Sequence, residues 1–475
     1  MNKSIDVQID EFLKPASDTI TNFIFSSFNF YGEQIPVVVC WLLFAGIFFT
    51  FYFKFLNIRF FKRAIRVALG KYDHPNDPGE ITHFQSFTAA MSGTIGLGNI
   101  AGVAVAISIG GPGAMIWMII TAFFGMTLKF VEVSLGHKYR VIYPDSTVSG
   151  GAIRYLSQGF SELKLPRLGK FLAIFFAICC IGGSFGGGNM FQANQAFQQI
   201  VESTGGMESP LYQKGWLVGL VFAVVVGAII IGGIKSIGKV TEKLVPLMAL
   251  IYVSACLYII LINFSLLPQT LTLAFTSAFN VDAATGGLIG AMIAGIKRAV
   301  FSNEAGIGSA PIAYAPAKSS SHLNTGFMSL LSPFVDTILI CSMSALVIII
   351  TGEYKNGGDG IQGVELTSRA FESALTWFPI VLSICITLFA LSTLITWSYY
   401  GLRCWTYIFG ISTFSKYSYQ FIFLMCTVLG ASINLGSVVN FSDSMIFAMS
   451  IPNIIALYFL APGLKKDLEN FKLEQ

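Results

Sequence analysis

The chain has 475 residues; 54% are hydrophobic, 11% are charged, and the mean hydropathy is +0.70. An average soluble protein carries about 25% charged residues. The composition therefore excludes an ordinary soluble domain and predicts an all-α integral membrane protein. The net charge of +4 is spread over separate loops, and we expect no nucleic-acid partner. The eight cysteines lie in or near apolar segments without metal-ligand spacing, which is typical of small buried side chains rather than of disulfides or a zinc site.

In chain order, an acidic and amphipathic segment at residues 1–33 predicts a short interfacial helix. It lacks the basic region and cleavage site of a removable signal peptide. Polar connections follow at 54–83 and 137–170. Between and beyond them, eleven apolar segments predict transmembrane helices. These segments cover residues 37–55, 84–109, 114–135, 171–200, 216–232, 244–266, 283–317, 327–350, 377–400, 419–432 and 445–461.

The second of these segments is unusual. It contains the sequence MSGTIGLGNIAGVAVA at residues 91–106, with four glycines and the polar Thr94 and Asn99 inside an apolar run. Each glycine costs about 1 kcal/mol relative to alanine in a helix interior. We expect the helix to break at mid-membrane, which is tolerated only where the backbone lines a cavity or is buried in protein. The alternative is a glycine-rich face that packs closely against another helix.

A second copy of this pattern favours the broken helix. The sequence SNEAGIGSAP at residues 302–311 aligns with SGTIGLGNIA at residues 92–101, at an offset of 210 residues. Two interrupted spans at matching places in two halves indicate the binding site of a secondary transporter. We therefore expect one N-terminal helix followed by a 5+5 inverted-repeat core with two discontinuous helices. The predicted units are 1–83 (the N-terminal segment, first helix and cytoplasmic connection), 84–266 (the first repeat), 267–461 (the second repeat) and 462–475 (a cytoplasmic tail).

The distribution of lysine and arginine predicts the orientation, because cytoplasmic loops are rich in both. Six alternate connections of the eleven-helix arrangement carry 21 Lys and Arg. The opposite set carries five, namely Lys3, Lys14, Lys214, Lys355 and Arg369. This asymmetry predicts an external N-terminus and a cytoplasmic C-terminus in a plasma membrane, such as a bacterial inner membrane.

Several long motifs carry a resemblance to a known family. They are GTIGLGNIAGVAVAISIGGPGAMIWM with GMTLKFVE, GGNMFQANQA (187–196), GGIKSIGKVTEKLVP (232–246), KRAVFSNEAGIGSAPIA (297–313), FVDTILICSMSALVI (334–348), STLITWSYYG (392–401) and MSIPNIIALY (449–458). From about residue 80 to 460 the chain resembles the alanine or glycine:cation symporter family, that is, the sodium:alanine symporters. The resemblance implies the inverted-repeat fold of the amino acid–polyamine–organocation superfamily. It also implies import of a small neutral amino acid with sodium, or sometimes with protons.

A free amino acid needs donors for its carboxylate, acceptors for its ammonium and a limit on side-chain size. Backbone N–H groups after the first break suit the carboxylate, and unwound carbonyls at the second break suit the ammonium. By the resemblance, Gln192 contacts the substrate; the alternative for any such amide is a hydrogen bond between helices. Thr393 and Trp397 lie four residues apart on one helix face, although a lone threonine is more often bonded to its own helix. The candidate substrate-binding residues are Gly98, Asn99, Phe185, Gln192, Gln195, Ser302, Asn303, Gly308, Thr393 and Trp397.

Sodium needs oxygen ligands, and carbonyls freed by the first break are candidates. In related neurotransmitter-type symporters that share the run Gly-Leu-Gly-Asn, the matching asparagine ligates sodium. Asn99 is thus a candidate for the ion, the carboxylate or both, and the alternative is that it links two helices. The candidate sodium ligands are Ser92, Thr94, Ile95, Asn99, Ser392 and Thr393.

Ionisable side chains inside the membrane cost about 3 kcal/mol each on insertion scales. Lys129 and Glu132 are expected to pair. Glu304 and Asp336 are expected to serve gating or charge balance, and Glu304, at the second break, is also a candidate for binding a proton. We assign none of them to catalysis, because the sequence contains no HExxH, GxSxG or Walker motif, and we expect no enzyme.

The sequence thus predicts a monomeric, sodium-coupled importer of alanine or glycine that works by alternating access, without a cofactor. Proton coupling, another amino acid such as glutamine or serine, and, less favoured, a channel remain alternatives. Arg154, Gln195, Tyr314 and Leu402 depart from the family pattern. Gln195 lies nearest the expected pocket and leaves the exact amino acid open, as well as the preference for L or D substrate.

Overall fold

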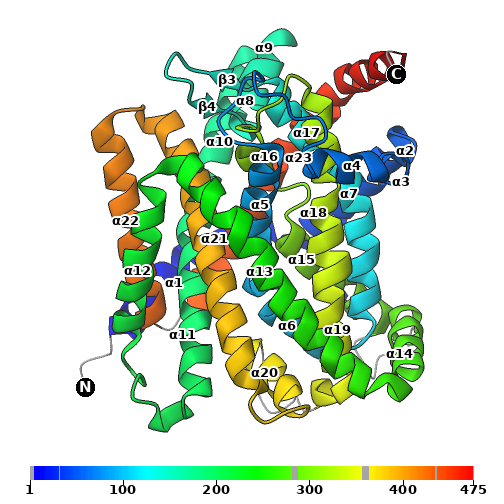
Figure 1. Ribbon diagram of the computed structural model, residues 1–475, viewed down its shortest axis with the longest axis vertical. Helices are drawn as coiled ribbons and strands as arrows, with labels where there is room; N and C mark the ends of the chain where they lie inside the picture. Colours follow the sequence, from blue (N-terminus) through cyan, green and yellow to red (C-terminus); the bar gives the residue numbers. More distant parts are fainter. Residues whose placement is uncertain (1–4, 31–32, 281–286, 356–362, 434–435, 474–475) are drawn as a thin grey trace.

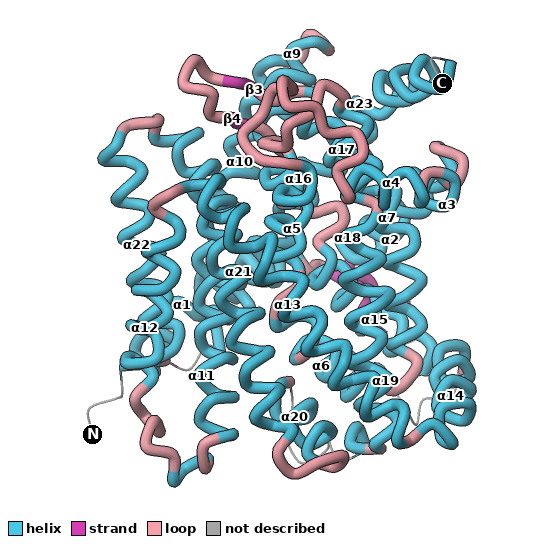
Figure 2. The backbone as a smooth tube through the Cα atoms, viewed as in Figure 1, coloured by secondary structure: helices cyan, strands magenta, loops and turns pink. Residues whose placement is uncertain are grey.

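The computed structural model describes residues 5–30, 33–280, 287–355, 363–433 and 436–473. The described chain is a bundle of long helices, with most loops at the two ends of the bundle (Figure 2). Two short antiparallel hairpins interrupt it: β1 (Ser27–Phe30) pairs with β2 (Glu33–Pro36), and β3 (Val141–Ile142) pairs with β4 (Val148–Ser149). The chain is thus essentially all-α, as its composition predicts.

The N-terminal region begins with α1 (Ile5–Ile24), which packs against the C-terminal helix α23 (Gly436–Leu473). Residues 1–4 of the expected interfacial segment lie outside the described residues. After the first hairpin the chain forms α2 (Val37–Tyr52), α3 (Leu56–Arg59) and α4 (Phe61–Ala68). Helix α2 packs against α7 (Ala114–Lys138), which follows the first broken helix.

The first broken helix forms as expected. Helix α5 (His83–Thr94) ends, a single turn η1 (Leu97–Asn99) follows, and α6 (Ala101–Gly110) continues at an angle of 59°. Thr82 caps α5, because its side chain accepts a hydrogen bond from the N–H of Gln85. The rest of this half comprises α8 (Ala152–Arg154), η2 (Tyr155–Gly159), α9 (Phe160–Glu162), α10 (Pro166–Phe185), η3 (Gly186–Met190), α11 (Phe191–Ser203), η4 (Gly206–Glu208), α12 (Gly215–Ile230) and α13 (Gly233–Ile262).

The second half contains a matching interruption. Helix α15 (Gly287–Asn303) ends where Glu304 adopts a left-handed conformation with φ of 54°, and α16 (Ala310–Tyr314) begins six residues later. The first residues of this expected span, 283–286, lie outside the described part of the chain. The other elements are η5 (Phe264–Leu266), α14 (Leu267–Phe279), α17 (His322–Ser329), α18 (Leu331–Pro333), η7 (Phe334–Cys341), α19 (Ser342–Thr351), α20 (Val364–Glu372), α21 (Phe378–Phe409) and α22 (Thr413–Ser432).

Six of the described helical stretches are long and apolar enough to cross a membrane, and the bent pair α5–α6 makes a seventh. Helices α2 and α12 are apolar but shorter. Large apolar side chains on the outside of the bundle are exposed, such as Val224 (65%) on α12 and Leu250 (66%) on α13. A helix that is apolar on its exposed face as well is typical of a membrane span. The chain is therefore a multi-pass membrane protein, while eleven spans and an inverted repeat stay predictions.

In Figure 1 the C-terminus, β3 and β4 lie at one end of the bundle, and α14 and α20 lie at the other. The blue helices α5 and α6 run through the middle, behind α13. Helix α5 packs against α13, α16 and α21, while α6 packs against α15, α19 and α20. The two halves of the first broken helix thus have different neighbours, and the break lies in the interior.

Candidate functional site

The first break opens onto a small buried cavity. The cavity has a volume of only about 20 Å³, which is enough for one or two water molecules. It is lined by Gly93, Thr94, Gly96, Gly98, Gly187, Gln192, Phe301, Glu304, Thr393, Trp397 and Ile446. Four predicted substrate-binding residues therefore meet here, namely Gly98, Gln192, Thr393 and Trp397. Thr94, predicted for sodium, and Glu304, predicted for charge balance, also reach the wall.

Gln192 stabilises the broken backbone. Its Oε1 accepts a hydrogen bond from the N–H of Leu97 at 3.3 Å, and its Nε2 donates to the carbonyl of Gly187 at 2.9 Å. The N–H of Leu97 has no helical partner because α5 has already ended, so the amide satisfies a group that the break sets free. On the opposite wall, Trp397 Nε1 donates to the carbonyl of Gly93 at 3.2 Å. Gln192 and Trp397 thus hold the two sides of the break.

The glycines allow the helices to come this close. A Cβ on Gly96 would lie 2.6 Å from Thr393 Oγ1, and one on Gly188 would lie 2.3 Å from Trp397 Cγ. Thr393 itself donates to the carbonyl of Phe389, in its own helix, at 3.0 Å. The hydroxyl oxygen retains lone pairs directed at the break. The same close approach makes the cavity small.

Asn99 lies behind the cavity wall. It is fully buried, its Oδ1 accepts from the N–H of Gly96 at 3.0 Å, and its Nδ2 donates to Asp336 Oδ1 at 2.7 Å. Its backbone carbonyl accepts from Ser344 Oγ at 2.7 Å. In this conformation Asn99 therefore links the break to η7 and α19, as in the alternative of an asparagine that joins two helices.

Asp336 is the centre of a polar cluster. Besides the bond from Asn99, its carboxylate accepts from Ser302 Oγ at 2.8 Å and from Thr337 Oγ1 at 2.7 Å. Asn303 joins the cluster by donating to Thr337 Oγ1 at 3.0 Å. Ser302 and Asn303, predicted for the substrate, thus lie beside Asp336 at the end of α15. Their side chains serve this cluster rather than the cavity wall.

The predicted sodium ligands fall into two places. Ser92 on α5 and Ser392 on α21 face each other: Ser92 Oγ donates to the carbonyl of Ser392 at 2.6 Å, and Ser392 Oγ donates to the carbonyl of Ser92 at 3.4 Å. Thr396 Oγ1 lies 3.0 Å from Ser92 Oγ. Ile95 is fully buried at the end of α5, and Thr94 donates to the carbonyl of Met91 at 3.2 Å within its own helix. Asn99 lies apart from this group.

Besides Asn99, Ser302 and Asn303, three more predicted substrate residues lie away from the cavity wall. The ring of Phe185 stacks on Tyr419, with the centroids 5.4 Å apart. Gly308 has a φ of 88°, and a Cβ there would lie 2.9 Å from Asn453 Cγ, so its role is in the turn and the close packing. Gln195 lines a different and larger cavity.

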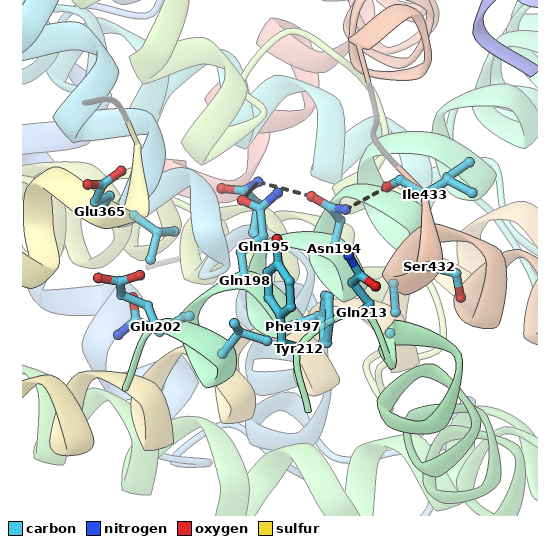
Figure 3. A pocket seen from close by; sticks show the side chains of 15 residues that line it. Asn194, Gln195, Phe197, Gln198, Glu202, Tyr212, Gln213, Glu365, Ser432 and Ile433 are labelled. Carbon is cyan, nitrogen blue, oxygen red and sulfur yellow. Dashed lines mark hydrogen bonds between the residues drawn. The ribbon is translucent and has the colours of Figure 1, made fainter. Parts of the chain in front are cut away.

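This larger cavity, of about 770 Å³, lies between α11, α12, α20 and α22 (Figure 3). Gln195 Nε2 donates to Asn194 Oδ1 at 3.3 Å and to Gln198 Oε1 at 3.1 Å. Glu202 and Glu365 contribute acidic groups to the wall. Helix α20, which contributes Glu365 to the wall, lies at the end of the bundle opposite the C-terminus (Figure 1).

At the other end, Arg140 joins the segments that flank both broken helices. Its guanidinium donates to the carbonyls of Ala315 at 2.8 Å, Ala317 at 2.6 Å, Pro78 at 2.7 Å and Ser319 at 2.8 Å. Burial lowers the pKa of Arg140 to about 10, so the group stays charged at neutral pH. Four carbonyls from the two flanking segments thus converge on one cation at this end of the bundle.

Sequence reasoning missed Phe301, Ile446 and Gly187 in the cavity wall. Phe301 precedes the polar residues of the second break, so the repeat itself points to it. No feature of the sequence points to Ile446 on α23, because nothing in an apolar helix indicates which residue faces a cavity.

The chain also matches known proteins along most of its length. The sequence model described as the sodium:alanine symporter family matches residues 17–475. The chain belongs to the sodium:alanine symporter family. Members of this family are symporters, and the family assignment therefore places the chain among transporters rather than enzymes.

Individual relatives agree with this assignment. The chain is 39% identical over 438 residues to the sodium/alanine symporter AgcS of Methanococcus maripaludis, covering 92% of this chain and 94% of the relative. An uncharacterized transporter of Haemophilus influenzae is 34% identical over 434 residues, covering 90% of this chain and 91% of the relative. The probable sodium/glutamine symporter GlnT of Bacillus subtilis is 33% identical over 439 residues, covering 92% and 87%.

Proposed function

We propose that the protein imports a small neutral amino acid, glycine or alanine first, together with sodium, by alternating access. The observation that carries this proposal is the cavity at the first break, because glycines, amides and freed backbone groups converge there. Its size favours the smallest substrates. A water-sized space must widen to admit any amino acid, and the displacement needed is least for glycine and alanine.

The parts of a zwitterion find complementary groups around this cavity. Backbone N–H groups between Gly96 and Gly98 suit the carboxylate, because they lie at the helix N-terminus that starts η1 and α6. The substrate would replace the side-chain amides of Asn99 and Gln192, which accept hydrogen bonds from Gly96 and Leu97 in the described conformation. The ammonium suits the carboxylate of Glu304 and the carbonyls of the second break. Trp397 and Phe301 bound the space for the side chain. The bound amino acid would thus lie between the two breaks.

The paired serines support a sodium site beside the substrate. Ser92 and Ser392 together offer two hydroxyl and two carbonyl oxygens within one small region. Thr396 adds a third hydroxyl. A hard cation prefers such an all-oxygen set. Because Ser92 is on α5 and Ser392 is on α21, a bound ion would hold the first broken helix against its neighbour and so favour one conformation over another.

The Arg140 contacts support alternating access. They close the end of the bundle that the charge distribution assigns to the cytoplasm, while the cavity around Gln195 lies near the opposite end. We propose that the described conformation is closed to the cytoplasm and that breaking the Arg140 contacts accompanies release of the substrate. The protein is proposed to work as a monomer, with its N-terminus outside.

The test is uptake of labelled alanine into proteoliposomes with competing unlabelled glycine, alanine, serine and glutamine, in sodium and in potassium buffers. We expect saturable uptake in sodium, competed best by glycine and alanine. Stronger competition by glutamine would instead indicate that this protein transports glutamine, the amino acid named for the GlnT relative. Equal uptake in both buffers, lost when the proton gradient is abolished, would replace sodium by protons as the coupling ion.

A further inference from the structure

A second buried polar site lies behind the break between α15 and α16. Lys129 and Glu132 are on adjacent turns of α7, and both are fully buried. The sequence predicts that they pair, but Lys129 Nζ donates to the backbone carbonyls of Asn303 at 2.9 Å and Glu304 at 3.0 Å. The ammonium thus binds the end of α15, and the carboxylate of Glu132 has to be satisfied in another way.

Only one of the two carboxylate oxygens of Glu132 has a side-chain hydrogen-bond partner. Its Oε1 accepts a hydrogen bond from Asn453 Nδ2 at 2.5 Å. Its Oε2 is buried and has no hydrogen-bond partner among the described residues. Asn453 also donates to the carbonyl of Gly306 at 2.8 Å and accepts from the hydroxyl of Tyr155. Glu132 is therefore connected to the second break through Asn453, with one oxygen left without a partner.

The neighbouring carboxyl groups differ from Glu132 in this respect. Asp336 accepts hydrogen bonds from three side chains, those of Asn99, Ser302 and Thr337. Glu304 accepts one from Ser309 and also reaches the cavity wall. Glu132 accepts a hydrogen bond from one side chain, that of Asn453, and lies beside the backbone of Gly306. Of the three carboxyl groups it is the one with a buried oxygen that has no hydrogen-bond partner among the described residues.

The charges do not balance if all these groups are ionised. Glu132 is faced by Lys129 on its own helix, by Glu304 at the second break and by Tyr155 on η2, and the same Lys129 is also faced by Glu304 and by Asp336 on η7. One ammonium balances one carboxylate, and the surplus negative charge is fully buried. A buried carboxylate without partners is so costly that the group takes up a proton instead. Protonation has the lowest free-energy cost at Glu132, because its Oε2 has no hydrogen bond to lose.

We propose that Glu132 is a proton-binding site, in which the carboxylate takes one proton from water and becomes a neutral carboxylic acid. No other bond forms or breaks. Because Asn453 binds both Glu132 and the carbonyl of Gly306, loss of the proton changes the charge next to the second break. The site lies outside the cavity and the paired serines. It therefore makes the protein respond to pH independently of sodium and of the substrate's identity.

The experiment is infrared difference spectroscopy of the full-length protein in lipid, with and without deuterium exchange, recorded as the pH is raised without sodium or substrate. We expect a band from a protonated carboxyl group that is present at neutral pH, lost at alkaline pH and missing in Glu132→Gln. The matched control is Glu372→Gln, which changes an exposed residue of α20 and is expected to keep the band. Should Glu132→Gln not fold, Glu132→Asp is expected to shift the band.

Four outcomes would overturn the proposal. They are a band that is unchanged in Glu132→Gln, a band lost only in Glu304→Gln, an unshifted band in Glu132→Asp, and the absence of any protonated carboxyl band from the wild type. Because the measurement uses neither sodium nor amino acid, its result is separate from the success or failure of the symport proposal.

Discussion

Gly96 provides the sharpest test of the cavity. A Cβ at this position would lie 2.6 Å from Thr393 Oγ1 and 3.3 Å from Gln192 Oε1. Ordinary contact begins near 3.4 Å, so Thr393 would have to move by about 0.8 Å for Gly96→Ala. Overpacking of this kind costs about 1–3 kcal/mol. The added Cβ also occupies the space in which the substrate is proposed to bind, so we expect Gly96→Ala to lower the affinity for alanine. If the whole cost falls on the bound state, the loss is roughly 5- to 150-fold, since about 1.4 kcal/mol corresponds to a factor of ten.

The assay is the concentration dependence of labelled alanine uptake, with the thermal stability of the purified protein measured alongside. The matched control is Gly290→Ala on α15, where an added Cβ would meet no atom within 4 Å, and it is expected to behave like the wild type. The double variant Gly96→Ala with Thr393→Ala removes the colliding hydroxyl and is expected to recover thermal stability. If Gly96→Ala leaves both affinity and stability unchanged, the reasoning about this cavity is refuted.

Other residues give further tests. Gln192→Leu leaves the N–H of Leu97 without its side-chain acceptor. We expect the free energy of unfolding to fall by about 1–3 kcal/mol and uptake to be strongly reduced. An unchanged free energy of unfolding would contradict the role of the amide. Ser392→Ala removes one proposed sodium ligand, and we expect the sodium concentration for half-maximal uptake to rise roughly tenfold, for about 1.4 kcal/mol, with an unchanged maximal rate as the supporting control. Arg140→Lys replaces a group that reaches four carbonyls, and we expect faster hydrogen–deuterium exchange around Ala317; unaltered exchange there would show that this end is held closed by other contacts.

The broken helices were predictable because their signal is local. Several glycines and polar residues within an apolar run indicate a break wherever it lies in the fold. The repeat at residues 302–311 adds the second break without any knowledge of tertiary structure. The convergence of Gln192, Thr393 and Trp397 on the first break follows from the family motifs that contain them.

The direction of individual side chains was less predictable. Gln192 and Gln195 are three residues apart, but they lie about 4.5 Å apart along the helix axis, and the structure places them at different cavities. The π-helical turn Gly186–Met190 directly before α11 also changes the register of this helix relative to its neighbours. No periodicity in the sequence reveals such a turn. The positions of these amides therefore depend on tertiary packing.

Asn99 and Lys129 illustrate a second limit. Each is polar and buried in an apolar environment, so each must find a partner, but the sequence does not say which one. Asn99 bonds to Asp336, which is 237 residues away, and Lys129 bonds to backbone carbonyls rather than to the nearby Glu132. Every residue has a backbone carbonyl, so the identity of the accepting residue does not reveal a hydrogen bond to its backbone. For such groups the sequence predicts the need for a partner and not its identity.

The most direct test of the central claim is accumulation of alanine against its own concentration gradient in proteoliposomes, driven only by an inward sodium gradient. The account predicts saturable accumulation that collapses when a sodium ionophore is added and that is weakened by Ser392→Ala. Accumulation that ignores the sodium gradient, or a flux that never saturates and only equilibrates alanine, would contradict sodium-coupled symport.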